Sequence, residues 1–133
     1  MRLAEISTRF PPAPGGVERH VAEIAPRLHA RGHTVDVLTS DLYTEYPWVR
    51  LPSEVPRHEE RPFGGVDRLP VWSLPGELHY PFFRGLERSL ERRRPDLVHV
   101  HTFGTHQVAV ARRVHRRGGA PFVLTAHFHP IWS

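Results

Sequence analysis

The feature that most constrains this chain is an alternation of short β-branched runs with segments of helical periodicity. Residues 2–7 form an apolar-rich opening, and apolar side chains then recur at helical spacing from Val17 until Gly32. Residues 34–39, Thr-Val-Asp-Val-Leu-Thr, alternate and are β-branched, as is typical of a strand. A strand, a helix and a second strand in this order predict a βαβ unit, whose two strands run parallel.

The rest of the chain continues the alternation. We expect a strand, a helix, a strand, a helix and a last strand at residues 66–72, 81–94, 96–101, 105–117 and 122–126. In the second of these segments, Phe82 and Phe83 would share one helix face with Leu86 and Leu90. The order of the elements is that of an α/β protein.

Such an alternation predicts a Rossmann-like, doubly wound parallel sheet with helices on both faces. Prolines interrupt residues 40–75, so no long element is expected there, and Pro26 predicts a kink or an irregular turn in the first helix. Ligands of these sheets bind beyond the carboxyl ends of the strands. Those ends carry the loops at residues 11–16, 101–106 and 127–130, which therefore form the candidate site.

Composition restricts the class of protein. The chain has 133 residues, 39% of them hydrophobic, which suits one folded domain. It has no cysteine, which excludes disulfides and thiolate zinc sites and favours a cytoplasmic location. No segment approaches the roughly 20 apolar residues of a membrane span. The net charge of +4 is compatible with phosphate groups or with peripheral contact at the inner face of a membrane.

Gly15 and Gly16 lie between the first strand and the first helix. Glycines at this place let the backbone approach a ligand closely, and the helix amides can receive a phosphate or sugar oxygen. A plainer interpretation is a tight turn in which Glu18 complements the helix dipole. Two glycines alone leave both interpretations open, because they form neither the dinucleotide fingerprint nor a phosphate-binding loop.

Histidines are concentrated in the candidate loops. His99 and His101 share one strand face, and with His106, His127 and His129 they could hold a metal ion. We favour instead a hydrogen-bonded core role for His99 and an opening into the cleft for His101, because no carboxylate accompanies these loops. An imidazole at position 127 or 129 could donate to a sugar hydroxyl or act as general acid or base, although surface exposure alone would also explain either residue.

Arginines are clustered on two predicted helices. The positions are Arg92, Arg93, Arg94, Arg112, Arg113, Arg116 and Arg117. A solvated helix face is the common meaning of such runs. A binding patch here would suit anionic lipid or a phosphorylated acceptor, and nucleic acid is not expected because no aromatic residues are interleaved with the arginines.

Three segments, in this order, resemble the N-terminal domain of the family 4 retaining glycosyltransferases, which have the GT-B fold. They are residues 11–39, which contain Gly-Gly-Val-Glu-Arg-His, residues 95–103, and residues 120–130, which contain Thr-Ala-His ending at His127. The resemblance covers essentially the whole chain. It implies that residues 1–133 form the acceptor-side half of a GT-B enzyme.

The resemblance also implies roles for individual residues. Gly15 and Gly16 would bind the phosphates of a nucleotide diphosphate sugar, and His127 would contact the donor sugar as the catalytic residue. The acceptor side would be lined by His101, Thr102, His20 and His129. No metal and no cofactor besides the nucleotide sugar are expected, and the acceptor would be a sugar, a lipid or a small molecule.

The chain departs from the family pattern in two respects. Glu5 stands in the first strand where the family usually has an apolar residue, so it must face solvent, find a partner or lie near the end of the strand. The second-domain signals, a basic pair and two glutamates eight positions apart, are absent from the sequence. We therefore expect a truncated chain that lacks the C-terminal donor domain and is inactive alone.

The predicted function is transfer of a sugar from a nucleotide diphosphate donor to a hydroxyl acceptor with retention of configuration. Two other functions remain open from the residues alone. One is a metal-dependent hydrolase that uses the histidines, and the other is a non-catalytic binding module or a partner subunit.

Overall fold

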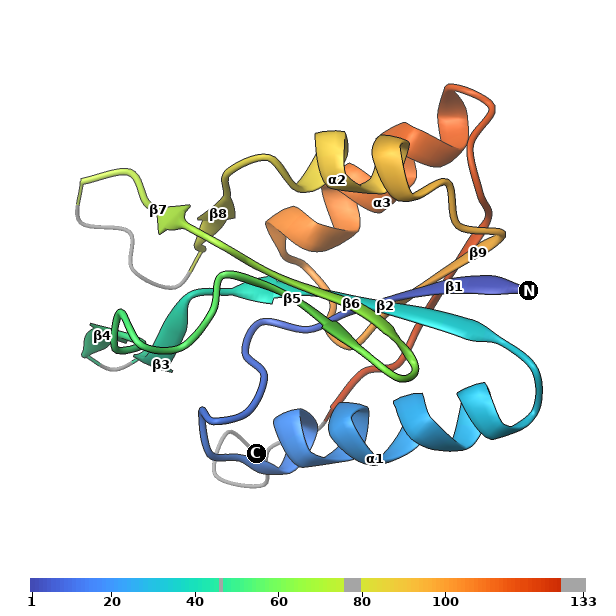
Figure 1. Cartoon of the computed structure of the whole chain (residues 1–133). Coiled ribbons are helices and arrows are strands. Elements are labelled where there is room, and N and C mark those ends of the chain that lie inside the picture. Colours follow the sequence, from blue (N-terminus) through green and yellow to red (C-terminus); the bar gives the residue numbers. More distant parts are fainter. Residues whose placement is uncertain (46, 76–79, 128–133) are drawn as a thin grey trace.

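The computed structural model describes residues 1–45, 47–75 and 80–127, arranged around one central sheet (Figure 1). The sheet has six strands in the order β10-β9-β1-β2-β6-β5. These strands are β1 (Arg2–Ile6), β2 (Thr34–Ser40), β5 (His58–Arg61), β6 (Gly64–Leu69), β9 (Leu97–Val100) and β10 (Phe122–Leu124). All neighbours are parallel except β5, which pairs antiparallel with β6 at the edge. The predicted Rossmann-like parallel sheet is confirmed, with one antiparallel edge strand in addition.

Helices cover both faces of the sheet. One face carries α1 (Gly16–Ala30), and the opposite face carries α2 (Leu86–Arg93) and α3 (His106–Arg116) (Figure 1). The doubly wound arrangement is therefore confirmed. Within the first helix, α-helical structure continues past Pro26. In the described residues, every helix is too short or too polar to cross a membrane.

The helix predicted over residues 81–94 is wrong in its first part. Phe82–Phe83 form β8, which pairs antiparallel with β7 (Val71–Trp72). The helix α2 begins only after Gly85, whose left-handed φ of 81° does not belong to an α-helix. The strand predicted over residues 66–72 is likewise divided, into β6 and β7, because Pro70 lies between them and has no N–H for a ladder hydrogen bond.

The proline-interrupted region contains short structure that its sequence pattern does not reveal. A second antiparallel pair joins β3 (Leu42–Glu45) to β4 (Trp48–Arg50). Figure 1 shows this pair beyond the end of the main sheet, on the same side as β7 and β8. Both small pairs therefore extend the molecule past the carboxyl ends of β2 and β6.

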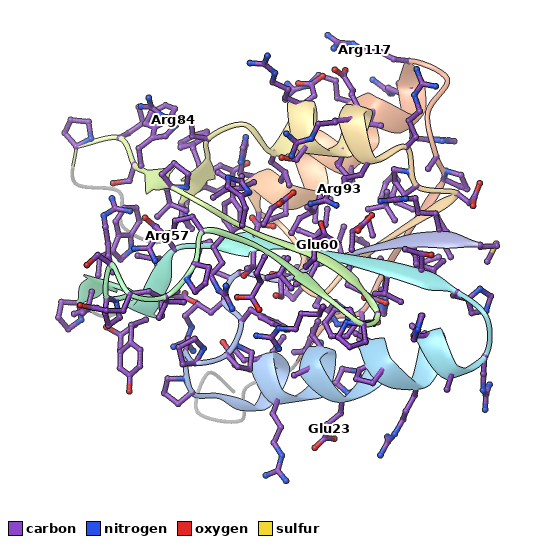
Figure 2. The ribbon with its side chains drawn as sticks, viewed as in Figure 1. Glu23, Arg57, Glu60, Arg84, Arg93 and Arg117 are labelled. Carbon is purple, nitrogen blue, oxygen red and sulfur yellow. The ribbon has the colours of Figure 1, made fainter. Side chains whose placement is uncertain are left out.

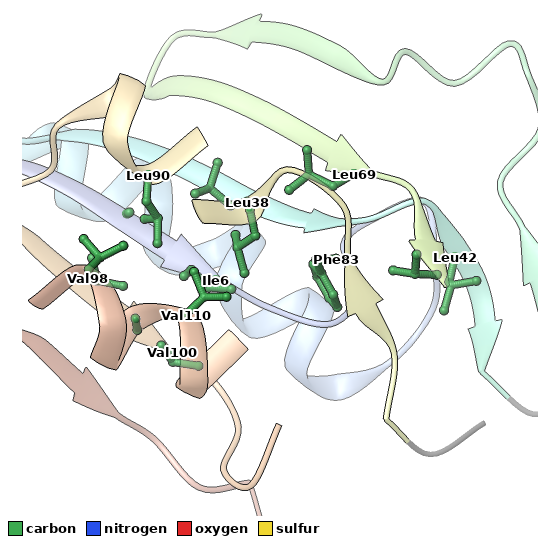
Figure 3. Close-up of a cluster of buried hydrophobic side chains, with 14 residues drawn as sticks. Ile6, Leu38, Leu42, Leu69, Phe83, Leu90, Val98, Val100 and Val110 are labelled. Atoms are coloured by element: carbon green, nitrogen blue, oxygen red, sulfur yellow. The ribbon is translucent and has the colours of Figure 1, made fainter. Parts of the chain in front are cut away.

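Each face of the sheet has its own hydrophobic cluster, as alternation along the strands requires. The cluster beneath α2 and α3 includes Ile6, Leu38, Leu42, Leu69, Phe83, Leu90, Val98, Val100 and Val110 (Figure 3). The cluster beneath α1 includes Leu3, Phe10, Val21, Ala25, Val35, Val37, Phe63 and Val66. Ala4 and Ile6 belong to the first cluster, so Glu5 between them faces α1.

Buried charges join α2 to the sheet. Arg93 of α2 donates to Asp67 of β6, with Nη2 2.9 Å from Oδ1, and its Nη1 lies 3.3 Å from Oδ1 of Asp36 in β2. Both carboxylates are almost fully buried. Figure 2 shows Arg93 and Glu60 together between α2 and the β5–β6 hairpin, where their charged atoms are 3.7 Å apart. Arg93 is therefore a structural cation rather than part of a solvated helix face.

Two other arginines of the predicted patch form ion pairs on the surface. Arg113 of α3 and Arg117, the C-cap residue of that helix, both contact Glu87 of α2, at 3.0 Å and 2.5 Å. All three side chains are partly open to solvent. These ion pairs connect the two helices. They explain the presence of two of the clustered arginines without a bound ligand.

Candidate functional site

The carboxyl ends of three neighbouring strands meet at one edge of the sheet. In the register of β1, β9 and β10, Glu5 lies opposite His99, and His99 lies opposite Val123. His101 and Thr102 directly follow β9, and His127 follows β10 by three residues. The parallel topology thus brings together residues that are far apart in the sequence, as predicted for this edge.

His101 is the central side chain of this edge. Its backbone N–H donates to the carbonyl of Ile6 over 3.0 Å, which fixes the residue against the end of β1. Its Nε2 lies 2.5 Å from Oε2 of Glu5, and its Nδ1 lies 3.3 Å from Nε2 of His127. The residue is only 3% exposed. The expectation that His101 opens into the cleft is wrong, because the hydrogen bond to Glu5 draws the ring under the α1 face.

Glu5 is the residue at this edge whose partners sequence reasoning missed. It is 2% exposed, and the same carboxylate oxygen that meets His101 lies 2.9 Å from Nδ1 of His99. Burial alone would raise the pKa of Glu5, but hydrogen bonds from His101 and His99 and their charges hold it below its ordinary value. The expectation that no carboxylate accompanies the histidines is therefore wrong. The carboxylate comes from the interior of β1, not from a loop.

His99 joins the Glu5 carboxylate to the segment that leads to His127. Its Nε2 lies 2.6 Å from Oγ1 of Thr125, two residues before His127. The ring is partly buried and lies 4.0 Å from the ring of His101, measured between centroids. The predicted hydrogen-bonded role of His99 agrees with this geometry, and its partners are now specified.

His127 lies between His101 and the first helix. The ring of His20, on α1, approaches those of His101 and His127 edge-on, with centroid separations of 5.7 Å and 5.9 Å. The pKa of His127 is lowered by burial and by the neighbouring imidazoles of His101, His20 and His99. This favours a neutral imidazole at position 127 near neutral pH.

The turn before α1 has the geometry of the plainer interpretation, and anion binding by Gly15 and Gly16 stays a prediction. Gly15 is the N-cap, with φ of 151°, and a Cβ at this position would collide with the carboxylate of Glu18. Glu18 is buried in the first turn and pairs with Arg9 over 3.0 Å. Gly15 and Gly16 themselves are exposed at the helix N-terminus.

The remaining predicted site residues divide between the edge and other places. Thr102 is half-buried next to His101, and His129 lies outside the described residues. His106 lies on the opposite face of the sheet, where its Nδ1 accepts the Phe83 N–H over 2.9 Å. Burial lowers the pKa of His106, with a further contribution from Arg113. His106 therefore does not join the other histidines.

A metal ion is the remaining chemical option at this edge. Within residues 1–45, 47–75 and 80–127, Glu5, His99 and His101 form the group of potential ligands close enough to share one ion. Their facing atoms are already paired with one another by hydrogen bonds. Two of the three side chains are buried, so a substrate would not reach an ion bound among them. The geometry therefore favours a hydrogen-bonded network over a hydrolytic centre.

Comparison with known proteins gives the family. The model of Glycosyltransferase Family 4 matches residues 14–132. The chain belongs to this family. The predicted resemblance is confirmed, and the site above is the part of a family 4 domain that lies at the carboxyl edge of its sheet.

Curated relatives and a solved structure agree with the assignment. The chain is 35% identical over 118 residues to a D-inositol 3-phosphate glycosyltransferase of Nocardiopsis dassonvillei, covering 85% of this chain and 26% of that protein. It is 32% identical over 121 residues to the protein of the same name from Frankia alni, covering 85% of this chain and 28% of that one. The chain thus spans little more than a quarter of these relatives.

The solved structure supports the fold. Sucrose-phosphate synthase from Thermosynechococcus elongatus matches with a TM-score of 0.63 and 19% identity, over 96% of this chain and 33% of that one. The N-terminal GT-B architecture predicted for this chain is consistent with the portion matched. At this identity the similarity concerns the fold alone.

Proposed function

We propose that this chain is the acceptor-side half of a glycosyltransferase that moves a sugar from a nucleotide diphosphate sugar to a hydroxyl group, with retention of configuration. The observation that carries the proposal is the convergence of His20, His101 and His127 at the carboxyl edge, next to the helix that Gly15 caps. Membership of family 4 supports it.

The proposed roles follow the chemistry of each group. The exposed amides at Gly15 and Gly16 would stabilise the departing diphosphate, and His127 would hydrogen-bond the donor sugar. Thr102, His20 and His129 would border the acceptor, and the buried His101 would support this side through its contacts with His20 and His127. Charge stabilisation by amides and basic side chains needs no metal ion or cofactor. The donor half would be supplied by residues outside this chain.

The test is an assay of the complete reading frame that encodes these residues. Nucleoside diphosphate release would be measured from UDP-, GDP- and ADP-sugars, first with D-inositol 3-phosphate as acceptor because two relatives carry that name. The anomeric configuration of the product, read by NMR, would test retention. Acceptor-dependent release with the donor's configuration kept is the expected result.

Substitution of His127 tests its proposed role in catalysis. Replacement by Ala should lower kcat by about 100-fold or more, within the range that general acid–base or electrostatic groups contribute. His29→Ala is the matched control, because His29 is an exposed histidine at the far end of α1 and should leave kcat unchanged. Equal activity of the two variants would remove His127 from the mechanism.

Two results would replace the proposal with the other functions. Hydrolysis without transfer, lost on addition of EDTA, would indicate a metal-dependent hydrolase. Ligand or partner binding with no sugar transfer from any donor would indicate a binding module or a subunit.

A further inference from the structure

The Glu5 carboxylate poses a problem of charge balance. It is the second-last residue of β1, beneath α1, ionised and almost without solvent. A net charge is costly to bury unless an opposite charge lies beside it. The groups at hydrogen-bond distance are the imidazoles of His99 and His101, so one of these rings must carry the compensating proton.

The geometry indicates His101 as the cationic ring. Its Nε2 lies 2.5 Å from the Glu5 oxygen, against 2.9 Å for Nδ1 of His99, and hydrogen bonds between ionised groups are the shorter ones. Burial alone opposes a charge on His101, but its side chain is fully buried beside the carboxylate, so solvent screens their attraction less than that of His99, which is 23% exposed. His99 can remain neutral, since its Nδ1–H donates to Glu5 and its Nε2 accepts the hydroxyl of Thr125.

The proton on His101 determines the state of His127. Both nitrogens of a cationic imidazole are donors, so Nδ1–H of His101 donates to Nε2 of His127 across 3.3 Å. A ring whose Nε2 accepts must carry its own hydrogen on Nδ1. We propose that Glu5 is a positioning residue which, through His101, holds His127 as the neutral tautomer protonated on Nδ1, ready to donate to the sugar.

Other basic groups lie around the network that Glu5, His99, His101 and His127 form. His20 faces the rings of His101 and His127 from α1. Arg27 of α1 and Arg31 at its C-cap line the cavity of about 390 Å³ that borders Glu5, His20 and His99. The charge of a protonated His20 would oppose a second proton on His127. The hydrogen bond between Thr125 and His99 fixes the segment that leads to His127.

The proposal deepens the proposed role of His127 and rests on it for its functional meaning. The tautomer of His127 can be measured in the absence of any enzymatic turnover. Long-range ¹H–¹⁵N correlation spectra of the 133-residue chain, uniformly labelled and kept in EDTA at pH 7, distinguish Nδ1–H, Nε2–H and cationic histidines. The wild-type chain should show His127 with its hydrogen on Nδ1 and His101 as the cation.

Glu5→Gln removes the charge and keeps the size of the side chain. His101 then has no counter-charge, becomes neutral and accepts at Nδ1, so His127 should change to the Nε2–H tautomer. Glu5→Asp, which keeps the charge, should retain the Nδ1–H form. Glu59→Gln is the matched control, because Glu59 of β5 is also paired with two basic side chains, Arg61 and Arg68. Strand β5 lies at the opposite edge of the sheet from β9 and β10.

Either of two results would overturn the proposal. One is a wild-type His127 that is cationic or carries its hydrogen on Nε2, which decides the matter even where a variant does not fold. The other is a folded Glu5→Gln chain in which His127 stays on Nδ1–H. Neither result bears on sugar transfer by the complete reading frame, so failure of this inference and failure of the proposed function are separate outcomes.

Discussion

Replacing Arg93 by Ala removes the cation that lies between two buried carboxylates. Asp67 loses its hydrogen bonds from Nε and Nη2, at 3.3 Å and 2.9 Å, and Asp36 loses the contact at 3.3 Å. Removing one partner of a buried ion pair costs about 3–5 kcal/mol. Asp36 keeps Arg2 and the Gly65 N–H, and Asp67 keeps its other neighbours, so the lower end applies.

We therefore expect Arg93→Ala to reduce the free energy of unfolding by about 3 kcal/mol. An unfolding entropy of about 2.1 cal/mol/K per residue, applied to 133 residues, converts this into a fall in Tm of about 11 °C. Urea unfolding followed by circular dichroism gives the first quantity and thermal unfolding the second. Arg93→Met keeps much of the aliphatic packing, so a similar loss in that variant would assign the effect to charge.

Arg92 provides the matched control. It is one residue earlier on α2 and approaches the same carboxylate at 3.5 Å, but its side chain is 64% exposed. Exposed pairs contribute about 0–1 kcal/mol, so Arg92→Ala should be close to the wild type. If the two alanine variants differed by less than about 1 kcal/mol, the argument from buried charge would be refuted.

The dependence of stability on pH gives a second test of the ion pairs that Arg93 forms. Burial opposes ionisation of Asp67, but hydrogen bonds from Arg93 and His58 lower its pKa below the ordinary value. A carboxyl group of this kind stabilises the fold above its unfolded pKa of about 4, and the stabilisation is lost as the pH falls through the folded pKa. The wild type should therefore lose Tm more steeply than Arg93→Ala below about pH 4.

Two further predictions concern other parts of the chain. Gly15→Ala should destabilise the protein by about 1–3 kcal/mol in urea, because the new Cβ meets Glu18 at a φ suited to glycine, whereas Gly16→Ala, with open space around its Cβ, should not. His106→Gln should flatten the dependence of Tm on pH between 7 and 5. The wild-type imidazole has a pKa lowered by burial, so its contribution is present above the unfolded pKa of about 6.5 and is lost as the pH falls through the folded pKa.

The central fold could be predicted from sequence because its signals are local. The β1-α1-β2 unit has alternating apolar residues in its strands and a helical repeat between them, and each pattern requires only a few neighbouring residues. The edge strand β5 could not be found in this way. Its four residues are His-Glu-Glu-Arg, and their pairing with β6 uses ion pairs such as Arg68 with Glu59 in place of an apolar face. The β7–β8 pair depends on a contact between distant segments, which local periodicity does not record.

The same distinction explains what was found of the site. His101 and His127 could be chosen because one ends and the other follows a predicted strand at the edge where ligands bind. Glu5 could be recognised as unusual in its strand but not assigned a partner. Its contact with His101 joins residues 96 positions apart and depends on β1 lying beside β9, which becomes known only from the register of the sheet.

The central place of β1 has a consequence for synthesis of the chain. One edge of β1 pairs with β2, but its other edge pairs with β9, which begins at Leu97. Once β6 is complete at Leu69, the first half of the sheet can assemble while that second edge is still without a partner. At a translation rate of about 5–20 residues per second, the interval before β9 appears is about 1–6 s. During this time the nascent chain presents an unpaired strand edge, and chaperone contact or pausing in this stretch would affect the yield of folded protein.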